Sequence, residues 1–544
     1  MGSDFYPKGP YGEAAWWTGV IYQIYPRSFL DSNGDGIGDL PGIISKVDYL
    51  ADTLGVDAIW LSPFYPSPQA DFGYDVADYT EVAPEYGTIG DFDRLVAACH
   101  AAGIRVIIDF VPNHSSDRHP WFLESRSSRR NPKREWYVWA DPAEDGGPPN
   151  NWLSVFGGRA WEYDELTEQY YLHSFLAEQP DLNWRNPAVR RVMLDVLRFW
   201  LDRGVDGFRI DVAHFIAKDP GLRDNPPAPA EAEGEWRDMG SYDSQIHRHD
   251  KNHDDVHVYF REIRALLDEY DETYSIGEIH EMDWGRWAKA YGDGDELHHV
   301  YDFSLIYAPW DAGSVRQRIE AQEAAIPNGA FPNHVLGNHD EPRIAYRYGQ
   351  EQARVAAMLL LTSRGTPTLY YGDEIGMTQQ LIPPEDQLDP WGQVGETMGR
   401  DGSRTPMQWT RGAHAGFCAP ATSNTWLPVH ADYGTCNVET QLDDPESILN
   451  LYRRLLSFRK TSSALQIGDH TRLPFGSTAV YGFRRIGNDE VLDVFLNFES
   501  NEVTLADVIG EVVLCTERTR EGEEILGELV VAGNQGLVIR IDGV

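Results

Sequence analysis

The stretch 204–215 combines a strand-like apolar pattern with two charged side chains, Arg209 and Asp211. Their i, i+2 spacing puts both on one face of a β-strand. A buried cation and a buried carboxylate must either pair with an opposite charge or serve a function. A structural ion pair is one interpretation. The other is an active-site carboxylate, because α/β barrels carry their catalytic residues at the C-terminal ends of the strands.

Two further carboxylates follow short β-type runs. Glu278 ends the run 273–278, and Asp340 follows the run 333–337. If these runs are barrel strands, both side chains reach the same face as Asp211. Carboxylates held close together push their pKa values apart, so that one is ionised while another keeps a proton. This arrangement suits cleavage of an acetal by double displacement, with the two catalytic carboxyl groups about 5–5.5 Å apart.

Two histidines are candidates for the same pocket. His339 directly precedes Asp340, and His114 follows the β-type run 105–111. A single histidine at the end of a strand is commonly a hydrogen-bonded core residue, and His114 keeps that alternative interpretation.

The elements that must position these residues alternate between strand and helix. Helical patterns cover 89–102, 187–203 and 446–460. Such alternation indicates parallel βαβ units, and eight strands close naturally into a (β/α)8 TIM barrel of the α/β class. The eight β-type runs lie at 20–25, 56–61, 105–111, within 204–215, and at 273–278, 298–303, 333–337 and 366–371.

With 544 residues, the chain is too long for one hydrophobic core. Residues 115–182 contain many tryptophans among Gly, Pro and Arg, too irregular and long for a βα loop. We predict an inserted subdomain after the third strand, and a C-terminal antiparallel β-sandwich domain where short alternating runs begin. The predicted segments are a first barrel part at 1–114, the inserted subdomain at 115–182, a second barrel part at 183–465 with a long loop at 378–409, and the C-terminal domain at 466–544.

The loop 31–39 carries oxygen-bearing side chains at alternate positions and glycines between them, a pattern that suits a hard cation. The twelfth position is Gly42 rather than a bidentate Glu, which argues against EF-hand regulation. We expect a structural Ca²⁺ (or Mg²⁺) here, with a metal-free Asx-rich turn as the alternative. The expected ligands are Asp31, Asn33, Asp35, Asp39 and the backbone carbonyl of Ile37.

The net charge of −40 disfavours nucleic acid, anionic membranes and polyanionic substrates as partners, so a neutral substrate is expected. The cysteines lack CxxC spacing, which argues against zinc and a disulfide framework. Cys418 and Cys436 could pair, but free thiols are expected. No signal sequence or long apolar window is present, so we expect a cytoplasmic protein. We also expect a monomer or weak homo-oligomer, without an organic cofactor.

Four short motifs resemble the signature regions of the α-amylase superfamily, glycoside hydrolase family 13: 109–114, 207–211, 277–278 and 338–340. Two others, Gln179-Pro-Asp-Leu-Asn-Trp184 and Arg404-Thr-Pro-Met-Gln-Trp409, resemble its α-glucosidase and oligo-1,6-glucosidase branch. The resemblance runs from about residue 16 to the C-terminus. It favours the active-site interpretation of Asp211 over the structural one.

The resemblance implies roles for individual residues. Asp211 would be the nucleophile and Glu278 the general acid/base. Asp340, with His339, would bind the 2- and 3-hydroxyls and stabilise oxocarbenium charge, and Arg209 would orient Asp211 and keep it ionised. The terminal glucose would be bound by Asp71, Tyr74, His114, Phe175, Gln179 and Arg400, with Tyr74 stacking beneath it and the Asp71–Arg400 pair sealing the far end of the pocket. The family's cation loop lies far from the cleft, so its expected role is stability.

The implied activity is that of a retaining, exo-acting α-glucosidase with transglucosylation activity. Oligo-1,6-glucosidase, sucrose isomerase and trehalose synthase remain open alternatives. Val212 directly follows Asp211; in this branch Val there often accompanies α-1,6 activity, and Ala or Thr α-1,4 activity. The non-catalytic heavy chains of amino-acid transporters share the barrel, but they carry a membrane segment and lack the three carboxylates that this chain retains.

Overall fold

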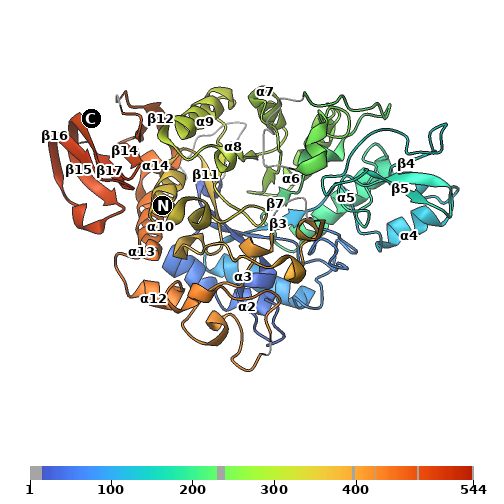
Figure 1. Cartoon of the computed structure of the whole chain (residues 1–544), viewed down its shortest axis with the longest axis horizontal. Helices are drawn as coiled ribbons and strands as arrows, with labels where there is room; N and C mark the ends of the chain where they lie inside the picture. The colour runs from blue at the N-terminus through green and yellow to red at the C-terminus, as the bar shows by residue number, and fades with distance from the viewer. Residues whose placement is uncertain (1–14, 230–238, 395–398, 423, 475–476, 542–544) are drawn as a thin grey trace.

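The computed structural model describes residues 15–229, 239–394, 399–422, 424–474 and 477–541 (Figure 1). A closed barrel of eight parallel strands forms its centre, which confirms the predicted TIM barrel. The strands follow one another around the barrel in chain order. They are β1 (Ile21–Ile24), β2 (Ala58–Leu61), β3 (Arg105–Phe110), β7 (Gly207–Ile210), β8 (Tyr274–Gly277), β9 (His299–Asp302), β10 (Asn333–Val335) and β11 (Thr366–Tyr370).

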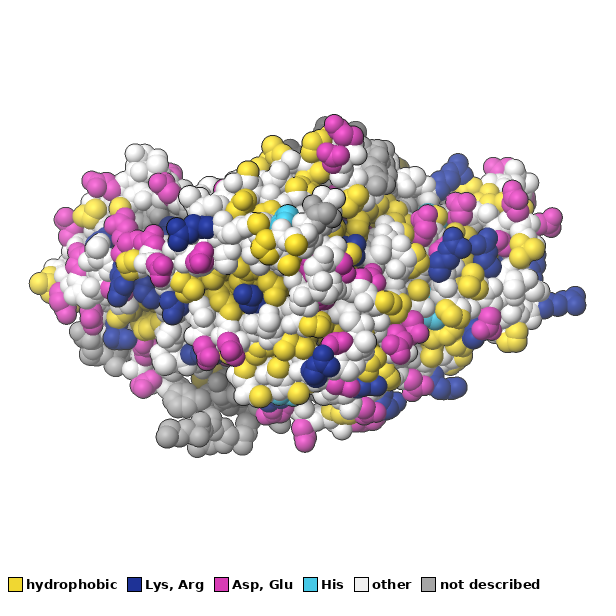
Figure 2. Space-filling view, turned by 90° about the horizontal axis from the view of Figure 1, so that it is seen from below, with side chains coloured by type: hydrophobic (Ala, Val, Ile, Leu, Met, Phe, Trp, Pro, Cys, Tyr) yellow, Lys and Arg dark blue, Asp and Glu magenta, His cyan; other side chains and the backbone are white. Residues whose placement is uncertain are grey.

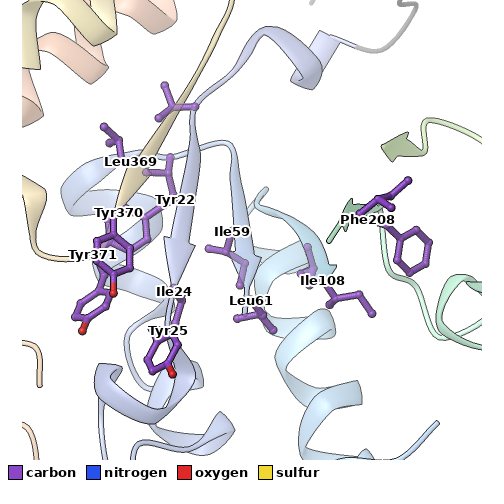
Figure 3. Close-up of a cluster of buried hydrophobic side chains, with 14 of the residues drawn as sticks. Tyr22, Ile24, Tyr25, Ile59, Leu61, Ile108, Phe208, Leu369, Tyr370 and Tyr371 are labelled. Carbon is purple, nitrogen blue, oxygen red and sulfur yellow. The ribbon is translucent and has the colours of Figure 1, made fainter. Parts of the chain in front are cut away.

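Alternate strand residues point to opposite sides of the barrel wall, as the period of two requires. Side chains on the outer side pack against the surrounding helices, as Tyr22, Ile59 and Ile108 do in Figure 3. Side chains on the inner side form a separate cluster that fills the barrel. This inner cluster includes Ile21, Ala58, Trp60, Ile107, Tyr274, Ile276, Tyr301 and Val335.

Helices cover the outside of the barrel. The helix α3 begins with a reciprocal capping box between Thr88 and Asp91, and buries one apolar stripe against the wall. The helices predicted at 89–102, 187–203 and 446–460 are all present, within one to two residues at each end. The long helices are α3 (Ile89–Ala101), α5 (Pro187–Leu201), α6 (Val256–Leu267), α9 (Ala312–Ala325), α10 (Ile344–Thr362) and α13 (Ile448–Thr461).

The segment between β3 and β7 contains a small sheet of its own. Its strands are β4 (Trp139–Ala140), β5 (Trp161–Asp164) and β6 (Gln169–Leu172), in the order β4-β6-β5, with α4 (Pro120–Ser127) beside them. Trp152 and Trp161 are buried in a core within this segment. Core packing therefore accounts for these two tryptophans. In Figure 1 the segment lies at the opposite end of the long axis from the C-terminal strands.

The C-terminal strands confirm the predicted antiparallel β-domain, but all six pair in one sheet rather than in the two separate sheets of a sandwich. One face packs on the core formed outside the barrel with its helices, through Leu492, Val494 and Leu496. The other face has a second core that includes Phe495, Val512 and Leu529. In sheet order the strands are β12 (Asp469–Arg472), β13 (Val480–Ile486), β14 (Val491–Asn497), β17 (Gly536–Arg540), β15 (Val503–Cys515) and β16 (Glu524–Val531).

On the face seen in Figure 2, acidic side chains are scattered over the surface with Lys and Arg among them. All four cysteines are free thiols, as expected. Among the helices that the structure describes, none is long and apolar enough to cross a membrane. Parts of three predicted segments lie outside the described residues: 1–14 of the first barrel part, 230–238, 395–398 and 423 of the second, and 475–476 and 542–544 of the C-terminal domain.

Candidate active site

The three predicted catalytic carboxylates stand beyond the C-terminal ends of barrel strands. Asp211 directly follows β7 and donates its backbone N–H to the carbonyl of Phe110 over 2.8 Å. Glu278 directly follows β8 and donates its N–H to the carbonyl of Ile210 over 2.9 Å. These bonds continue the barrel's hydrogen-bonding pattern and fix both side chains at its mouth. Asp340 lies further along, in the loop after β10.

Arg209, on β7, joins Asp211 to Glu278. Its Nη1 donates to Oδ1 of Asp211 over 2.6 Å and to Oδ1 of Asp109 over 2.7 Å. Its Nη2 lies 2.7 Å from Oε2 of Glu278. All four side chains are buried. One guanidinium therefore holds three carboxylates within a single charge cluster, and two of them are the predicted nucleophile and acid/base.

The cluster has fewer positive than negative groups, which affects its protonation. Burial raises the pKa of Asp211; Arg209 opposes this effect, while Glu278 and Asp109 add to it. Burial also raises the pKa of Asp109, to about 6, against the opposing effect of Arg209. Carboxylates crowded around one cation cannot all ionise at neutral pH. The cluster therefore retains a proton in the free enzyme.

His339 and Asp340 lie beside this cluster. The amide nitrogen of Gln23 lies 2.8 Å from Nδ1 of His339, which places the ring proton on Nε2. That nitrogen lies 2.8 Å from the Tyr74 hydroxyl and 3.2 Å from Oδ2 of Asp340. Burial lowers the pKa of His339 to about 3, so the ring is a neutral hydrogen-bond donor. The Tyr74 ring stacks on it, with the ring centroids 5.4 Å apart.

The predicted glucose-binding residues meet around Asp71. The Gln179 amide nitrogen donates to Oδ2 of Asp71 over 3.1 Å and lies 3.1 Å from Nε2 of His114. Phe175 packs beside His114, with the ring centroids 5.2 Å apart. Burial lowers the pKa of His114 to about 4. His114 is thus both well hydrogen-bonded, as its alternative interpretation held, and part of the candidate pocket.

Arg400 lies at the same end of the site as Asp71. Its Nη2 lies 2.6 Å from Oδ1 of Asp71, and its Nη1 lies 3.0 Å from Oδ1 of Asp340. The side chain is buried and lies over the Trp391 ring, 4.6 Å from the centroid. The Trp391 indole N–H in turn donates to the carbonyl of Val155 over 3.4 Å. The loop after β11 and the inserted segment therefore meet at this end of the pocket.

Several polar residues of the site escaped prediction. Asp389 is fully buried and accepts hydrogen bonds from the backbone N–H, Nε and Nη2 of Arg400 over 2.7, 2.9 and 2.6 Å. Arg404 donates to Oδ1 of Asp340 over 2.9 Å. His280 places its Nε2 3.0 Å from Oε1 of Glu278. Only His280 had a signal in the sequence, because its i, i+2 spacing from Glu278 puts both on one face of an extended chain.

Val212 adopts a left-handed conformation, with φ 35° and ψ 47°. This region is disfavoured for a β-branched residue. The turn ends the strand at Ile210 and sends the chain into the short helix η4 (Ala213–Ile216). The Val212 side chain packs in an apolar cluster with Val155 and Phe215, close to Asp211 in sequence.

The loop 31–39 forms a chain of Asx turns. Oδ1 of Asp31 accepts the N–H groups of Asn33 and Gly34 over 3.0 and 2.6 Å. Asp39 caps the helix α2 (Leu40–Ile44) by accepting the Gly42 N–H over 2.6 Å. The donor chemistry fits a hard cation, but no three His, Cys, Asp or Glu side chains within the described ranges are placed to hold a metal ion. The cation stays a prediction.

Comparison with known proteins identifies the family. The model of the alpha amylase catalytic domain matches residues 23–468. The chain is 43% identical to a probable alpha-glucosidase of Rhizobium meliloti over 495 residues, which cover 88% of this chain and 89% of the relative. It is 38% identical to an oligo-1,6-glucosidase of Parageobacillus thermoglucosidasius over 527 residues, 89% of this chain and 91% of the relative. The crystal structure of an alpha-glucosyl transfer enzyme, XgtA, superposes with a TM-score of 0.91 at 42% identity, over 96% of this chain and 99% of the other. The chain therefore belongs to glycoside hydrolase family 13, the α-amylase family, in its α-glucosidase branch.

Proposed function

We propose that this chain is a retaining, exo-acting α-glucosidase that releases glucose from the non-reducing end of short α-glucosides. The observation that carries the proposal is the Arg209 bridge, which binds Asp211 through Nη1 and Glu278 through Nη2. The bridge keeps two buried carboxylates within the reach of one guanidinium. Such closeness favours double displacement. Direct attack by water needs a wider separation of the two carboxyl groups, because the water must fit between them.

In the first step, Asp211 attacks the anomeric carbon as the glycosidic bond breaks, and Glu278 protonates the leaving oxygen. For this step Glu278 must carry the proton and Asp211 must be ionised. In the second step, Glu278 takes a proton from water, the water oxygen bonds to the anomeric carbon, and the bond to Asp211 breaks. Asp340, beside Arg400 and Arg404, would face the positive charge that develops on the sugar ring.

Removal of single glucose units from the chain end is supported by the ion pair between Asp71 and Arg400. Asp71 and Arg400 form a buried ion pair at 2.6 Å, and Asp389 also binds Arg400. A longer glucan could not pass through this end without breaking the pair. Hydroxyl groups of a terminal glucose would instead find Asp71, Gln179 and His114 as hydrogen-bonding partners.

Transglucosylation is a second activity of the same site. In the second step a sugar hydroxyl can replace water as the acceptor, and Glu278 would take its proton in the same way. The similarity to an alpha-glucosyl transfer enzyme supports this activity.

The experiment that tests the proposal measures glucose release from maltose, isomaltose, sucrose, trehalose and p-nitrophenyl α-glucoside, with NMR detection of the first anomer formed. We expect α-glucose first, with single glucose units released from maltotriose and no internal cleavage of starch. First release of β-glucose would contradict retention. Internal cleavage of long chains without glucose release would contradict the closed pocket.

We further propose that the enzyme acts in the cytoplasm, as a monomer or weak homo-oligomer. Four free cysteines support a reducing compartment. The proposed Ca²⁺ (or Mg²⁺) would be held by the loop 31–39 and would serve stability rather than chemistry, since the proposed reaction steps use carboxylates alone.

A further inference from the structure

The two carboxylate oxygens of Glu278 have different surroundings. Oε2 lies 2.7 Å from Nη2 of Arg209 and accepts the backbone N–H of Val212 over 2.9 Å. Both partners are donors, and neither can accept a proton from Glu278. A proton on Glu278 therefore belongs on Oε1. Oε1 is the oxygen that must serve as acid in the first step and as base in the second.

Oε1 is the oxygen that contacts His280. The Nε2 atom of His280 lies 3.0 Å from it. The imidazole ring stacks on Phe303, with the ring centroids 4.5 Å apart and the planes only 7° from parallel. The His280 side chain is 27% exposed, whereas that of Glu278 is 5% exposed. His280 is thus a partly exposed partner of a buried carboxylate, and stacking on Phe303 orients its ring.

We propose that His280 is a positioning residue for Glu278, whose Nε2–H holds Oε1 in place and favours the carboxylate form that acts as base. The inference rests on the proposed function, because it takes Glu278 as the acid/base. In the first step the Glu278 proton moves to the leaving oxygen, and the new negative charge on Oε1 finds the Nε2–H donor already in place. In the second step Oε1 takes the proton from water or from a sugar hydroxyl, and the hydrogen bond weakens again.

The charged and titratable groups around this pair come from several elements. Arg209 on β7 lies on the Oε2 side. His214 on η4 has its ring centroid 6.0 Å from that of His280, and burial together with Lys251 lowers the pKa of His214 well below its usual value. Against the effect of burial, Arg209 and His280 lower the pKa of Glu278, while Asp340 raises it. Since His214 stays neutral, His280 is the histidine whose loss should change the titration of Glu278.

The test compares His280→Phe with His280→Gln. Phe keeps a ring that can stack on Phe303 but removes the donor, whereas Gln keeps a donor. The pH dependence of kcat/KM is measured for two substrates. Maltose releases glucose, a poor leaving group, and p-nitrophenyl α-glucoside releases nitrophenol, a good one. With His280→Phe we expect the alkaline limb of the pH profile of kcat/KM for maltose to move to higher pH. At neutral pH we expect kcat for maltose to fall about tenfold, since a hydrogen bond to a charged group is lost, and kcat for the nitrophenyl glucoside to fall less. His280→Gln should retain most of the native kcat for both substrates.

An unchanged alkaline limb in His280→Phe, or equal losses in the Phe and Gln variants, would overturn the inference. Phe303→Leu gives a second route, because it retains His280 but removes the stacked ring. We expect a smaller shift of the limb in the same direction, and no shift would count against the role of Phe303. If the unmodified enzyme releases no glucose from maltose or the nitrophenyl glucoside, the proposed function itself fails. If it is active but neither variant moves the limb, only the inference about His280 fails.

Discussion

The backbone N–H of Val212 donates to Oε2 of Glu278 over 2.9 Å. The residue after the predicted nucleophile thus fixes the predicted acid/base. Val212 reaches this position only in a left-handed conformation, with φ 35°, which is costly for a β-branched side chain. The turn directs the Val212 side chain into the apolar cluster with Val155 and Phe215, and this placement leads to the first prediction.

The Val212 side chain should influence linkage preference. Val212→Thr keeps the shape and the β-branch but replaces a methyl group with a hydroxyl. We expect the ratio of kcat/KM for maltose to that for isomaltose to rise about tenfold, the usual scale for one such group in a pocket. Val155→Thr makes the same change elsewhere in the apolar cluster and should alter the ratio less. Equal ratios in the native enzyme and Val212→Thr would disprove the assignment.

Asp389 should be needed to hold Arg400 at the closed end of the pocket. Asp389→Asn removes the charge that three Arg400 donors share. Breaking one side of a buried ion pair costs about 3–5 kcal/mol, so we expect kcat/KM for maltose to fall by at least about 100-fold, mainly through KM. Asp386→Asn, at an exposed position of the same loop, serves as control. Similar kinetics for the two variants would exclude this role.

The buried histidines should make the fold sensitive to acid. Burial lowers the pKa of His299 to about 3, so between pH 6 and 4 the unfolded chain binds a proton there and the folded chain does not. The contribution of His299 to the free energy of unfolding is fully present above about pH 6.5. It is lost as the pH falls, at about 1.4 kcal/mol per pH unit.

His299→Asn keeps an acceptor for the Tyr274 hydroxyl and cannot titrate. The variant should therefore lose less stability than the native protein as the pH falls from 6 to 4. Denaturant or thermal midpoints at several pH values measure this difference, and parallel curves for the two proteins would contradict the assignment.

The loop 31–39 should bind Ca²⁺. After treatment with EDTA we expect the Tm of the native protein to fall by several degrees and to recover when Ca²⁺ is added, because a ligand that binds only the folded state stabilises it. Asp31→Asn should lose this Ca²⁺ response, whereas Asp48→Asn, at an exposed position, should keep it. A Tm that does not respond to EDTA or Ca²⁺ would leave the loop as the metal-free Asx-rich turn.

Residues tied to a periodic pattern were predictable. Asp211 and Glu278 directly follow apolar strand runs, and the barrel places such residues at its mouth whatever the loops do. The inward and outward alternation of residues such as Trp60 and Ile59 also follows from the strand period. The closed barrel and the C-terminal antiparallel domain were predicted for the same reason.

Other features depend on contacts that no local pattern encodes. Asp389 and Arg404 lie in irregular loops far from any strand run, and they are linked through Arg400 and Asp340. The left-handed Val212 contradicts its own local preference and persists because the surrounding structure fixes it. The single C-terminal sheet in place of a sandwich depends on pairing between strands distant in sequence, which alternation alone does not specify.

The most direct test of the central claim is peptide mapping by mass spectrometry of Glu278→Gln after incubation with α-glucosyl fluoride. Fluoride leaves without acid assistance, so the first step proceeds, whereas the second step lacks its base and the intermediate accumulates. We predict one added glucosyl group on the peptide that contains Asp211, and none in Glu278→Gln/Asp211→Asn. A glucosyl group on any other residue, or turnover of the fluoride without an adduct in both variants, would contradict the account.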